Sequence, residues 1–338
     1  MSVSPCRAHV PLSFLVLYPD GRASPPVPSQ YERSKGARDV KVLNFGSLNI
    51  DYVYKMDSFV QPGETKTVLE RQVNCGGKGL NQSVALASAG LDTWHAGLVG
   101  PDGQFLVDKL AARGVHTDFI RTVPESVGHA IIEVDASGQN RIIVYPGTNR
   151  MLTVAYVNEV LSHFAPGDVV LLQNETNLVG EIVTLAADRG LLVALNAAPM
   201  DDGVKSFPLE KVRWLFVNEI EAAALSGERH YASAARVLRE RCPNTEVIMT
   251  LGAEGSMYLG NEGNVTSTAC RVSPVDTTGA GDTFTGFFLR GVLGPSLPLS
   301  PLELASVASG IAVTRPGAAD SIPTLEEVLS SSLHTVLP

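Results

Sequence analysis

The sequence predicts an α/β fold built on a doubly wound, mostly parallel β-sheet flanked by helices. Two observations lead to this prediction. First, four short and nearly continuous apolar runs, VVLLQNE, LLVALNAAP, WLFVNEIE and VIMTLG, are separated by helical segments. Such runs are typical of strands that are buried on both faces of a parallel sheet. Second, a glycine-containing turn leads directly into an amphipathic helix in VDTTGAGDTFTGFFLR, residues 275–290, and helix starts of this kind favour phosphate.

The size and composition are those of an ordinary globular protein. A chain of 338 residues is long enough for one large α/β domain with a small appendage. Hydrophobic residues make up 44% of it, which allows a sizeable core. The net charge of −9, with no long basic run, argues against nucleic acid or an anionic membrane as partner. No apolar run reaches membrane-spanning length, and four scattered cysteines predict a reducing, cytoplasmic location.

Residues 1–39 differ from the rest of the chain. Prolines recur there among Ser, Arg and Gly, and such a composition cannot build a packed unit. We therefore expect a disordered extension or an over-long gene start, followed by a folded domain over residues 40–338. The alternative is a targeting segment, because the short apolar run from Leu12 to Tyr18 is similar to a weak signal-peptide core.

The first part of the folded domain predicts a strand, a turn and a helix. Residues 40–51, VKVLNFGSLNID, predict a strand that runs into a turn ending in Asn49 and Asp51. Residues 73–91 predict a glycine turn followed by a helix with apolar positions at helical spacing.

The following elements continue the alternation. Residues 95–100 predict a strand and residues 104–114 a helix that stops at a glycine. The two β-branched runs of residues 129–147 flank a polar, glycine-containing segment and predict a hairpin. After the four apolar runs, a Ser-Pro-Leu-Glu capping box predicts a helix over residues 300–314, which leads into a loop over 315–321.

Polar side chains follow the four apolar runs, at the point where each predicted strand ends. In open α/β sheets, ligands bind at the carboxyl ends of the strands. We therefore expect the following residues near a ligand: Gln173, Glu175, Asn196, Asn218, Glu221 and Thr250.

The turn within residues 275–290 predicts an anion site beside a carboxylate. Val275 ends a predicted strand, Gly279 and Gly281 allow a tight turn, and a helix opens at Asp282. The amides at the start of that helix favour phosphate, and Asp282 stands where it could take a proton from an attacking hydroxyl. The alternative is that Asp282 only caps the helix.

The second glycine cluster, GGKGLNQ at residues 76–82, predicts a site for a polyhydroxyl ligand. It is neither a Walker A loop nor a dinucleotide fingerprint, because the glycine spacing and the residue after the lysine differ. Lys78 and Asn81 offer hydrogen-bond donors, while Asn49 and Asp51 suit vicinal hydroxyls. For each of them the alternative is a polar turn residue without a ligand.

Other chemistries find little support in the sequence. It contains no HExxH and no GxSxG motif, and its histidines are dispersed. Glu175 and Glu221 could form a carboxylate pair for glycoside hydrolysis. The two glycine turns instead favour a place for them near a metal–phosphate or sugar group.

Taken together, these motifs resemble the ribokinase-like (PfkB) sugar kinase family. GSLNID, PGET, GGKGLNQ, QNE, LNAAP, VNEIE, TLGAEG, VDTTGAGDTF and AVTRPGAADSIP occur in the family's order and at similar spacings. The resemblance extends from about Lys41 to near the C-terminus.

The resemblance implies a Rossmann-like domain with a small β-sheet lid, and transfer of the ATP γ-phosphate to the 5-hydroxyl of ribose. It implies that Asp282 is the general base and that Gly279, Ala280 and Gly281 form the anion hole. The sugar-binding residues that it implies are Asn49, Asp51, Gly77, Lys78, Asn81, Glu175 and Asp282. The nucleotide-binding residues that it implies are Asn218, Thr250, Leu251, Gly252, Ala253, Glu254, Gly255 and Gly281.

The resemblance also implies cations and a partner subunit. It implies that Glu221 lies near Mg²⁺. The residues that match the family's monovalent-cation loop, usually a potassium site, are Asp276, Thr278, Ala312, Arg315, Gly317 and Ser321. The implied lid comprises residues 49–67 and 127–146, and two such lids often join to make a homodimer.

Two positions depart from the family pattern. Leu80 stands where small residues are common, and Phe105 stands where many members have glycine. Neither belongs to the turn that carries Asp282, so they bear on the choice of sugar more than on kinase activity. The sequence leaves open a kinase for deoxyribose, fructose, another sugar or a nucleoside, and a non-catalytic sugar- or nucleotide-binding regulator.

Overall fold

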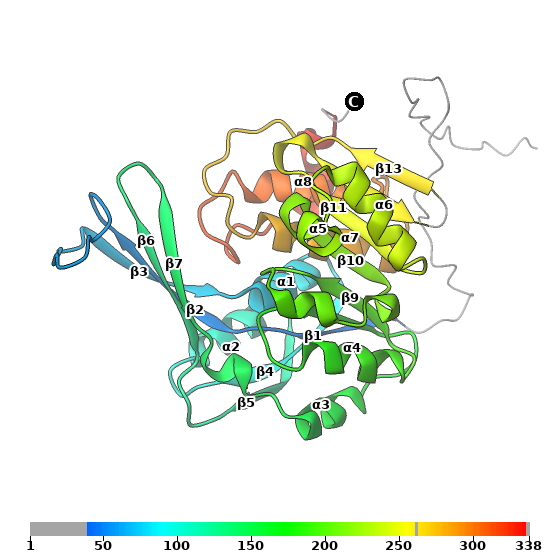
Figure 1. Cartoon of the computed structure of the whole chain (residues 1–338), viewed down its shortest axis with the longest axis horizontal. Coiled ribbons are helices and arrows are strands. Elements are labelled where there is room, and N and C mark those ends of the chain that lie inside the picture. Colours follow the sequence, from blue (N-terminus) through cyan, green and yellow to red (C-terminus); the bar gives the residue numbers. More distant parts are fainter. Residues whose placement is uncertain (1–38, 261–262, 336–338) are drawn as a thin grey trace, which may run out of the picture.

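The computed structural model describes residues 39–260 and 263–335 (Figure 1). Except for Asp39, the predicted N-terminal extension lies outside these ranges. A nine-stranded sheet forms the centre of the described part. In spatial order its strands are β13 (Gly263–Ser267), β12 (Ser256–Gly260), β11 (Glu246–Thr250), β10 (Trp214–Asn218), β9 (Leu192–Asn196), β8 (Val169–Gln173), β1 (Lys41–Phe45), β4 (Asp92–Val99) and β5 (His116–Thr122). All neighbours run parallel except β12, which is antiparallel to both β11 and β13.

Helices cover both faces of this sheet. One face carries α1 (Lys78–Ser88), α2 (Gln104–Ala112), α7 (Ala280–Leu293), α8 (Pro301–Ala312) and α9 (Leu325–Ser330). The other face carries α3 (Val154–Leu161), α4 (Val179–Ala187), α5 (Glu219–Ser226) and α6 (Tyr231–Arg241). Successive strand residues enter opposite cores, as Val169 and Val170 do in β8. The nearly continuous apolar runs therefore are strands buried on both faces, which confirms the predicted fold class.

Short 3₁₀ helices complete the described chain. They are η1 (Gly147–Arg150), η2 (Asp202–Ser206), η3 (Leu209–Lys211), η4 (Gly252–Glu254) and η5 (Ser332–Thr335). No helix in residues 39–260 or 263–335 combines the length and the apolar character that crossing a membrane requires.

A second, four-stranded sheet projects from the side of the central one (Figure 1). Its order is β3 (Glu70–Gly76), β2 (Asn49–Lys55), β6 (Gly128–Val134) and β7 (Asn140–Tyr145). The strands β6 and β7 are the predicted hairpin. β3 lies beyond the segment 49–67 that was expected to contribute to this sheet. Asn49 and Asp51 lie in strand β2, and not in a turn as predicted, because β2 pairs with β3 and β6 along its whole length.

Two predicted boundaries around the 275–290 turn were wrong. The described chain has no strand at Val275, whose amide instead donates to the Val313 carbonyl at 2.7 Å. Helix α7 begins at Ala280, two residues before the predicted start, because Gly279 adopts φ 77° and turns the chain into the helix there. The predicted capping box of Ser300 and Glu303 is present at the start of α8, which ends at Ala312.

The contact between α1 and α7 has no room for a side chain at Gly286. A Cβ atom there would lie 2.5 Å from the Cβ of Ala85. We expect Gly286→Ala to lower the free energy of unfolding by about 1–3 kcal/mol, because overpacking forces the two helices apart. Urea unfolding followed by circular dichroism measures this change. The matched control is Gly281→Ala in the same helix, where a Cβ meets no described atom within 4 Å, so a loss of equal size there would contradict the explanation.

Candidate active site

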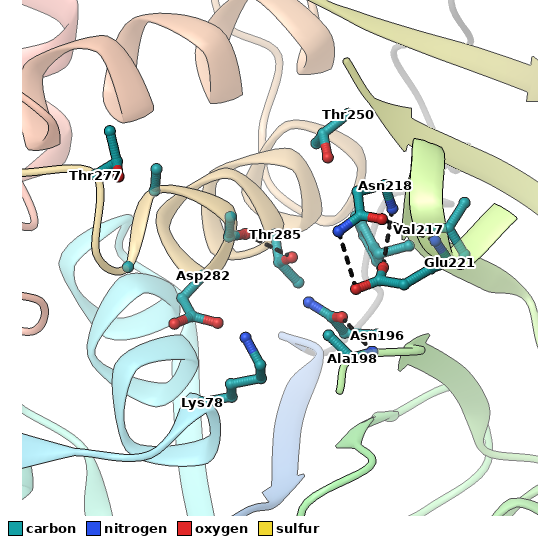
Figure 2. Close-up of a pocket in the computed structure, with 14 residues that line it drawn as sticks. Lys78, Asn196, Ala198, Val217, Asn218, Glu221, Thr250, Thr277, Asp282 and Thr285 are labelled. Carbon is teal, nitrogen blue, oxygen red and sulfur yellow. Dashed lines mark hydrogen bonds between the residues drawn. The ribbon is translucent and has the colours of Figure 1, made fainter. Parts of the chain in front are cut away.

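A cavity of about 200 Å³ lies where the carboxyl ends of β9, β10 and β11 meet the start of α7 (Figure 2). Each strand end contributes one predicted polar residue: Asn196 from β9, Asn218 from β10 and Thr250 from β11. The full lining is Lys78, Asn196, Ala198, Phe216, Val217, Asn218, Glu221, Thr250, Thr277, Gly279, Ala280, Gly281, Asp282 and Thr285. The structure therefore brings together residues from both glycine turns and from three strand ends.

Asp282 lies in the first turn of α7 and faces α1. Its side chain is only 6% exposed. One carboxylate oxygen accepts a hydrogen bond from the Asn81 amide at 3.0 Å, and the other accepts one from the Gln82 amide at 2.8 Å. The N-cap residue of α7 is Gly279, which makes no side-chain cap. Asp282 therefore does not cap the helix, and its carboxylate is held by α1 at the wall of the cavity.

The start of α7 offers backbone amides to the same cavity. The first turn of an α-helix has no intrahelical partners for its amides, and the helix dipole adds partial positive charge there. Gly279, Ala280 and Gly281 form this turn and line the cavity. A Cβ built at Gly281 would have no neighbour within 4 Å apart from the adjoining residues and the backbone of the helix itself, so the space beside Gly281 is open. The Ala280 amide donates to the Thr277 carbonyl at 3.3 Å, so an anion in this space would be met first by the amides of Gly279 and Gly281.

The Lys78 side chain reaches the cavity from the first residue of α1. Figure 2 shows its amine directed toward the Asp282 carboxylate. The negative charge of Asp282 raises the pKa of Lys78 against the opposing effect of burial, with smaller contributions from Glu175 and Glu221. Lys78 is therefore a half-buried ammonium among carboxylates, and it lines the cavity together with the start of α7.

Glu175 holds the glycine turn that precedes α1. Its carboxylate accepts a hydrogen bond from the Lys78 amide at 2.8 Å and another from the Ser47 hydroxyl. The Ser47 oxygen in turn accepts from the Gly79 amide at 3.1 Å. Burial raises the pKa of Glu175, and Lys78 and these hydrogen bonds oppose the shift. Ser47 was not predicted as a site residue, although it belongs to the GSLNID motif.

Asp51 lies on β2, beside the glycine turn. Burial, and to a smaller extent the charge of Glu175, raises the pKa of Asp51 to about 7. A Cβ at Gly76 would lie 2.1 Å from an Asp51 carboxylate oxygen, so any side chain there would displace the Asp51 carboxylate. On the same strand, the Asn49 amide oxygen accepts from Asn149 at 2.7 Å. Of the predicted sugar residues, Asn49, Asp51, Gly77, Asn81 and Glu175 do not line the cavity described above.

Asn218 and Glu221 are joined to each other at the start of α5. The Glu221 carboxylate accepts from the Asn218 backbone amide at 2.9 Å, and its other oxygen accepts from the Asn218 side chain at 3.1 Å. This capping box turns the carboxylate toward the cavity, as Figure 2 shows. Burial raises the pKa of Glu221. Within the described ranges, no three His, Cys, Asp or Glu side chains gather as a metal-binding group.

Only the first residue of the predicted nucleotide turn lines the cavity. Thr250 ends β11, and the chain then folds back so that the Leu251 amide donates to the Gly255 carbonyl at 2.8 Å. Gly252 and Gly255 have φ values of 53° and 114°, which this compact turn requires. Ala253 and Glu254 are exposed beside it.

The predicted cation residues come from two loops behind α7. The Asp276 carboxylate accepts from the Thr278 amide and, at 2.9 Å, from the Gly317 amide, so it joins the loops. Ala312 ends α8, and the Ser321 hydroxyl donates to the Ala318 carbonyl at 2.8 Å. The Arg315 side chain pairs with Glu327 of α9. The Asp276 carboxylate and the Arg315 side chain are therefore already engaged within the protein.

Several residues of the site were not expected from the sequence. They are Ser47, Gln82, Ala198, Phe216, Val217, Thr277 and Thr285. Ala198, Phe216, Val217, Thr277 and Thr285 each lie within three residues of a predicted residue, and this proximity in the chain was the available signal. Gln82 is part of the GGKGLNQ motif, but nothing in the local pattern indicates that it reaches Asp282.

Three comparisons with known proteins found relatives that match most of this chain. The model of the pfkB family carbohydrate kinases matches residues 39–325. A ribokinase of Haemophilus influenzae is 35% identical over 303 residues, which cover 86% of this chain and 97% of that protein.

Solved structures also match most of the chain. The ribokinase of Cryptococcus neoformans, in complex with ADP, is 31% identical with a TM-score of 0.76, over 86% of this chain and 99% of that chain. The ribokinase of Arabidopsis thaliana, complexed with ribose and ATP, is 27% identical with a TM-score of 0.77, over 88% of this chain and 99% of that chain.

Proposed function

The chain belongs to the pfkB family of carbohydrate kinases, and from this premise we propose that it transfers the γ-phosphate of ATP to the 5-hydroxyl of D-ribose. The observation that carries the proposal is the Asp282 carboxylate, held by α1 beside the start of α7 at Gly279–Gly281 and the Lys78 ammonium. A base, an anion site and a cation within one cavity are what phosphoryl transfer to an alcohol requires.

In this proposal each group has one task. Asp282 orients the attacking hydroxyl and takes its proton. The amides of Gly279, Ala280 and Gly281 receive the transferred phosphoryl group, where charge on its oxygens is stabilised by the helix start. Lys78, at the start of α1, neutralises negative charge on the phosphate from the other wall of the cavity, facing the start of α7.

The sugar is proposed to bind between the small sheet and the start of α1. Asn49, Asp51 and Asn81 offer side-chain donors and acceptors to its hydroxyls. Gly77, with φ 92°, allows the backbone to approach the ring. Glu175 supports this wall through its hydrogen bonds to Ser47 and Lys78, and the small sheet is the proposed lid over residues 49–67 and 127–146, together with β3.

The nucleotide is proposed to lie along the ends of β10 and β11. Asn218 and Thr250 line the cavity there, and the turn from Leu251 to Gly255, which follows Thr250, is proposed to border the nucleoside. The Glu221 carboxylate fits a role near Mg²⁺, because oxygen ligands suit this ion and the capping box turns the carboxylate toward the phosphates. Bound Mg²⁺ supplies charge neutralisation of the phosphates.

A monovalent cation, K⁺ by preference, is proposed between the two loops behind α7. Asp276 closes these loops on each other through its bonds to Thr278 and Gly317. The backbone oxygens of this region, around Ala312, Arg315 and Ser321, are the expected ligands. A cation there would hold the loop that precedes Gly279 and so keep the anion site in place.

We further propose a cytoplasmic homodimer that is formed through the small sheets. Ile142, Ile143 and Val144 on β7 are 55%, 64% and 58% exposed. Ile142 and Val144 point to one face of the small sheet and Ile143 to the other, and exposed apolar side chains of this kind mark interaction surfaces. Sedimentation velocity of the wild type and of an Ile143→Lys variant tests this, and a monomeric wild type would refute it.

Release of ADP in the presence of Mg²⁺, with a panel of sugars and with or without K⁺, tests the proposed reaction. We expect D-ribose to give the highest kcat/KM and K⁺ to increase it. The panel includes 2-deoxyribose, fructose and nucleosides, and a higher kcat/KM with one of these would replace ribose as the substrate. Tight ribose binding without any ADP release would indicate a regulator instead of an enzyme.

Ribose affinity is expected to depend on the ionisation of Asp51. The ionised carboxylate accepts hydrogen bonds from sugar hydroxyls, and the pKa of Asp51 is raised to about 7. Binding should therefore weaken as the pH falls below 7, by up to about tenfold per unit. Calorimetric titration with ribose over a pH series measures this. Asp51→Asn should bind ribose more weakly and lose this dependence, and an unchanged slope would contradict the assignment to Asp51.

A further inference from the structure

A row of buried side-chain amides lies behind the Asp282 carboxylate. Gln82 of α1 donates to Asp282 at 2.8 Å and accepts from the Gln173 amide nitrogen at 2.7 Å. That same nitrogen donates to the Asn44 amide oxygen at 3.0 Å. Asn44 and Gln82 are 0% exposed and Gln173 is 1% exposed. The row therefore crosses the core from β1 and β8, through α1, to the first turn of α7.

The direction of the row is determined by its own partners. The Gln173 nitrogen faces two amide oxygens, so a rotated amide at this position would place oxygen against oxygen. Because the Gln82 oxygen is occupied by Gln173, its nitrogen must face Asp282. Two amide dipoles are thus aligned, each with its positive end toward the carboxylate. In a buried environment such aligned hydrogen bonds strengthen one another.

We propose that Gln82, oriented by Gln173, is a positioning residue that sets the rotamer of the Asp282 carboxylate for proton transfer. The inference rests on the proposed role of Asp282 as the base. Asn81 holds one carboxylate oxygen and Gln82 the other, so the plane of the carboxylate is defined by two separate donors. Asn81 also belongs to the proposed sugar site, whereas Gln82 faces only the interior of the protein.

A purely structural role explains this arrangement less well. The contact between α1 and α7 is already filled by close packing of Ala85 against Gly286. Burying polar side chains costs free energy unless their donors and acceptors form hydrogen bonds. An apolar pair of side chains would stabilise the contact between α1 and α7 without this condition. The donors instead converge on the one carboxylate that faces the cavity.

The test compares Gln82→Met with a control in the same helix. Gln82→Met keeps the side-chain volume and removes the donor, so we expect kcat to fall by about 10- to 100-fold while KM for ribose and for ATP changes less than about threefold. Gln173→Met should show a smaller loss of kcat of the same kind. The control is Ser83→Ala, which removes buried hydrogen bonds to Asn44 at 2.9 Å and to His95 at 2.8 Å without a bond to Asp282. Asn44 stays held by its 2.8 Å bond to the Gly79 carbonyl, so kcat of this variant should stay within about threefold of wild type.

A double-mutant cycle separates positioning from general damage. If Gln82 acts through Asp282, then Asp282→Asn combined with Gln82→Met should have the same residual kcat as Asp282→Asn alone. If the losses of kcat in the two single variants multiply in the double variant, the inference is overturned. It is also overturned if the falls in kcat of Gln82→Met and Ser83→Ala are proportional to their losses of thermal stability. If Gln82→Met is fully active while Asp282→Asn is inactive, the positioning role of Gln82 is refuted and the role of Asp282 as the base stands. An active Asp282→Asn refutes the base on which both proposals rest.

Discussion

Asp282→Asn is expected to bind ribose and ATP and to lose turnover by a factor on the order of hundreds or more. The asparagine amide keeps the size of the side chain and can still accept from Asn81 or Gln82 with its oxygen. It cannot take a proton from the sugar hydroxyl. Steady-state ADP release gives kcat, and calorimetric titration of each substrate gives the affinities. Together they separate the chemical step from binding.

The control for this variant is a carboxylate outside the site. Asp188 is exposed and pairs with Lys211 at 2.7 Å, so Asp188→Asn should leave kcat unchanged. In a loose phosphoryl transition state the base is needed late, and its orientation counts for more than its proton affinity. Turnover of Asp282→Asn near that of the wild type would show that another group, or water, takes the proton.

Lys78→Met is expected to lower kcat/KM for ATP by about 100- to 1000-fold. In the wild type the Lys78 ammonium lines the same cavity as the Asp282 and Glu221 carboxylates and the start of α7, and both carboxylates raise the pKa of Lys78. Without it, the triphosphate would enter a cavity lined by two carboxylates with no side-chain cation among its lining residues. The loss should appear in the constants for ATP more than in the affinity for ribose.

Charge and shape can be separated at this position. Lys78→Arg retains the positive charge on a larger, planar group, and it should recover part of the lost activity. Lys205→Met, which removes an exposed lysine paired with Asp202 at 2.8 Å, should behave as wild type. Equal kcat/KM for Lys78→Met and wild type would contradict the role of Lys78 in phosphate binding.

Local patterns in the sequence predicted the fold because burial is a local signal. The run VVLLQ is apolar throughout because both faces of this strand are buried under helices. The capping box of Ser300 and Glu303 is a contact between residues three positions apart in the chain. The two glycine turns were recognised because their conformations need glycine, as Gly77 and Gly279 do. These features depend on few residues at short separation.

The remaining details depend on contacts across the chain. The bond from Gln82 to Asp282 joins residues 200 positions apart, and no periodicity encodes it. Val275 was expected to end a strand because it is apolar and a glycine-containing turn follows it. Its amide instead donates to the carbonyl of Val313, which follows α8. Asn49 and Asp51 were placed in a turn because the partner strands β3 and β6 lie far away in the sequence.

The short connection between β1 and β2 has a mechanical consequence for how a ligand can enter. Residues 46–48 are held on several sides: the Gly46 amide donates to Ala96, the Leu48 amide donates to Asn149, and the Ser47 carbonyl accepts from Leu80. A lid that swings as a whole needs a flexible hinge at its base, whereas residues 46–48 are hydrogen-bonded to the central sheet and to α1. At its root the small sheet therefore behaves as a fixed wall, so movement that opens a passage for the sugar must arise farther out, toward the tips of its strands.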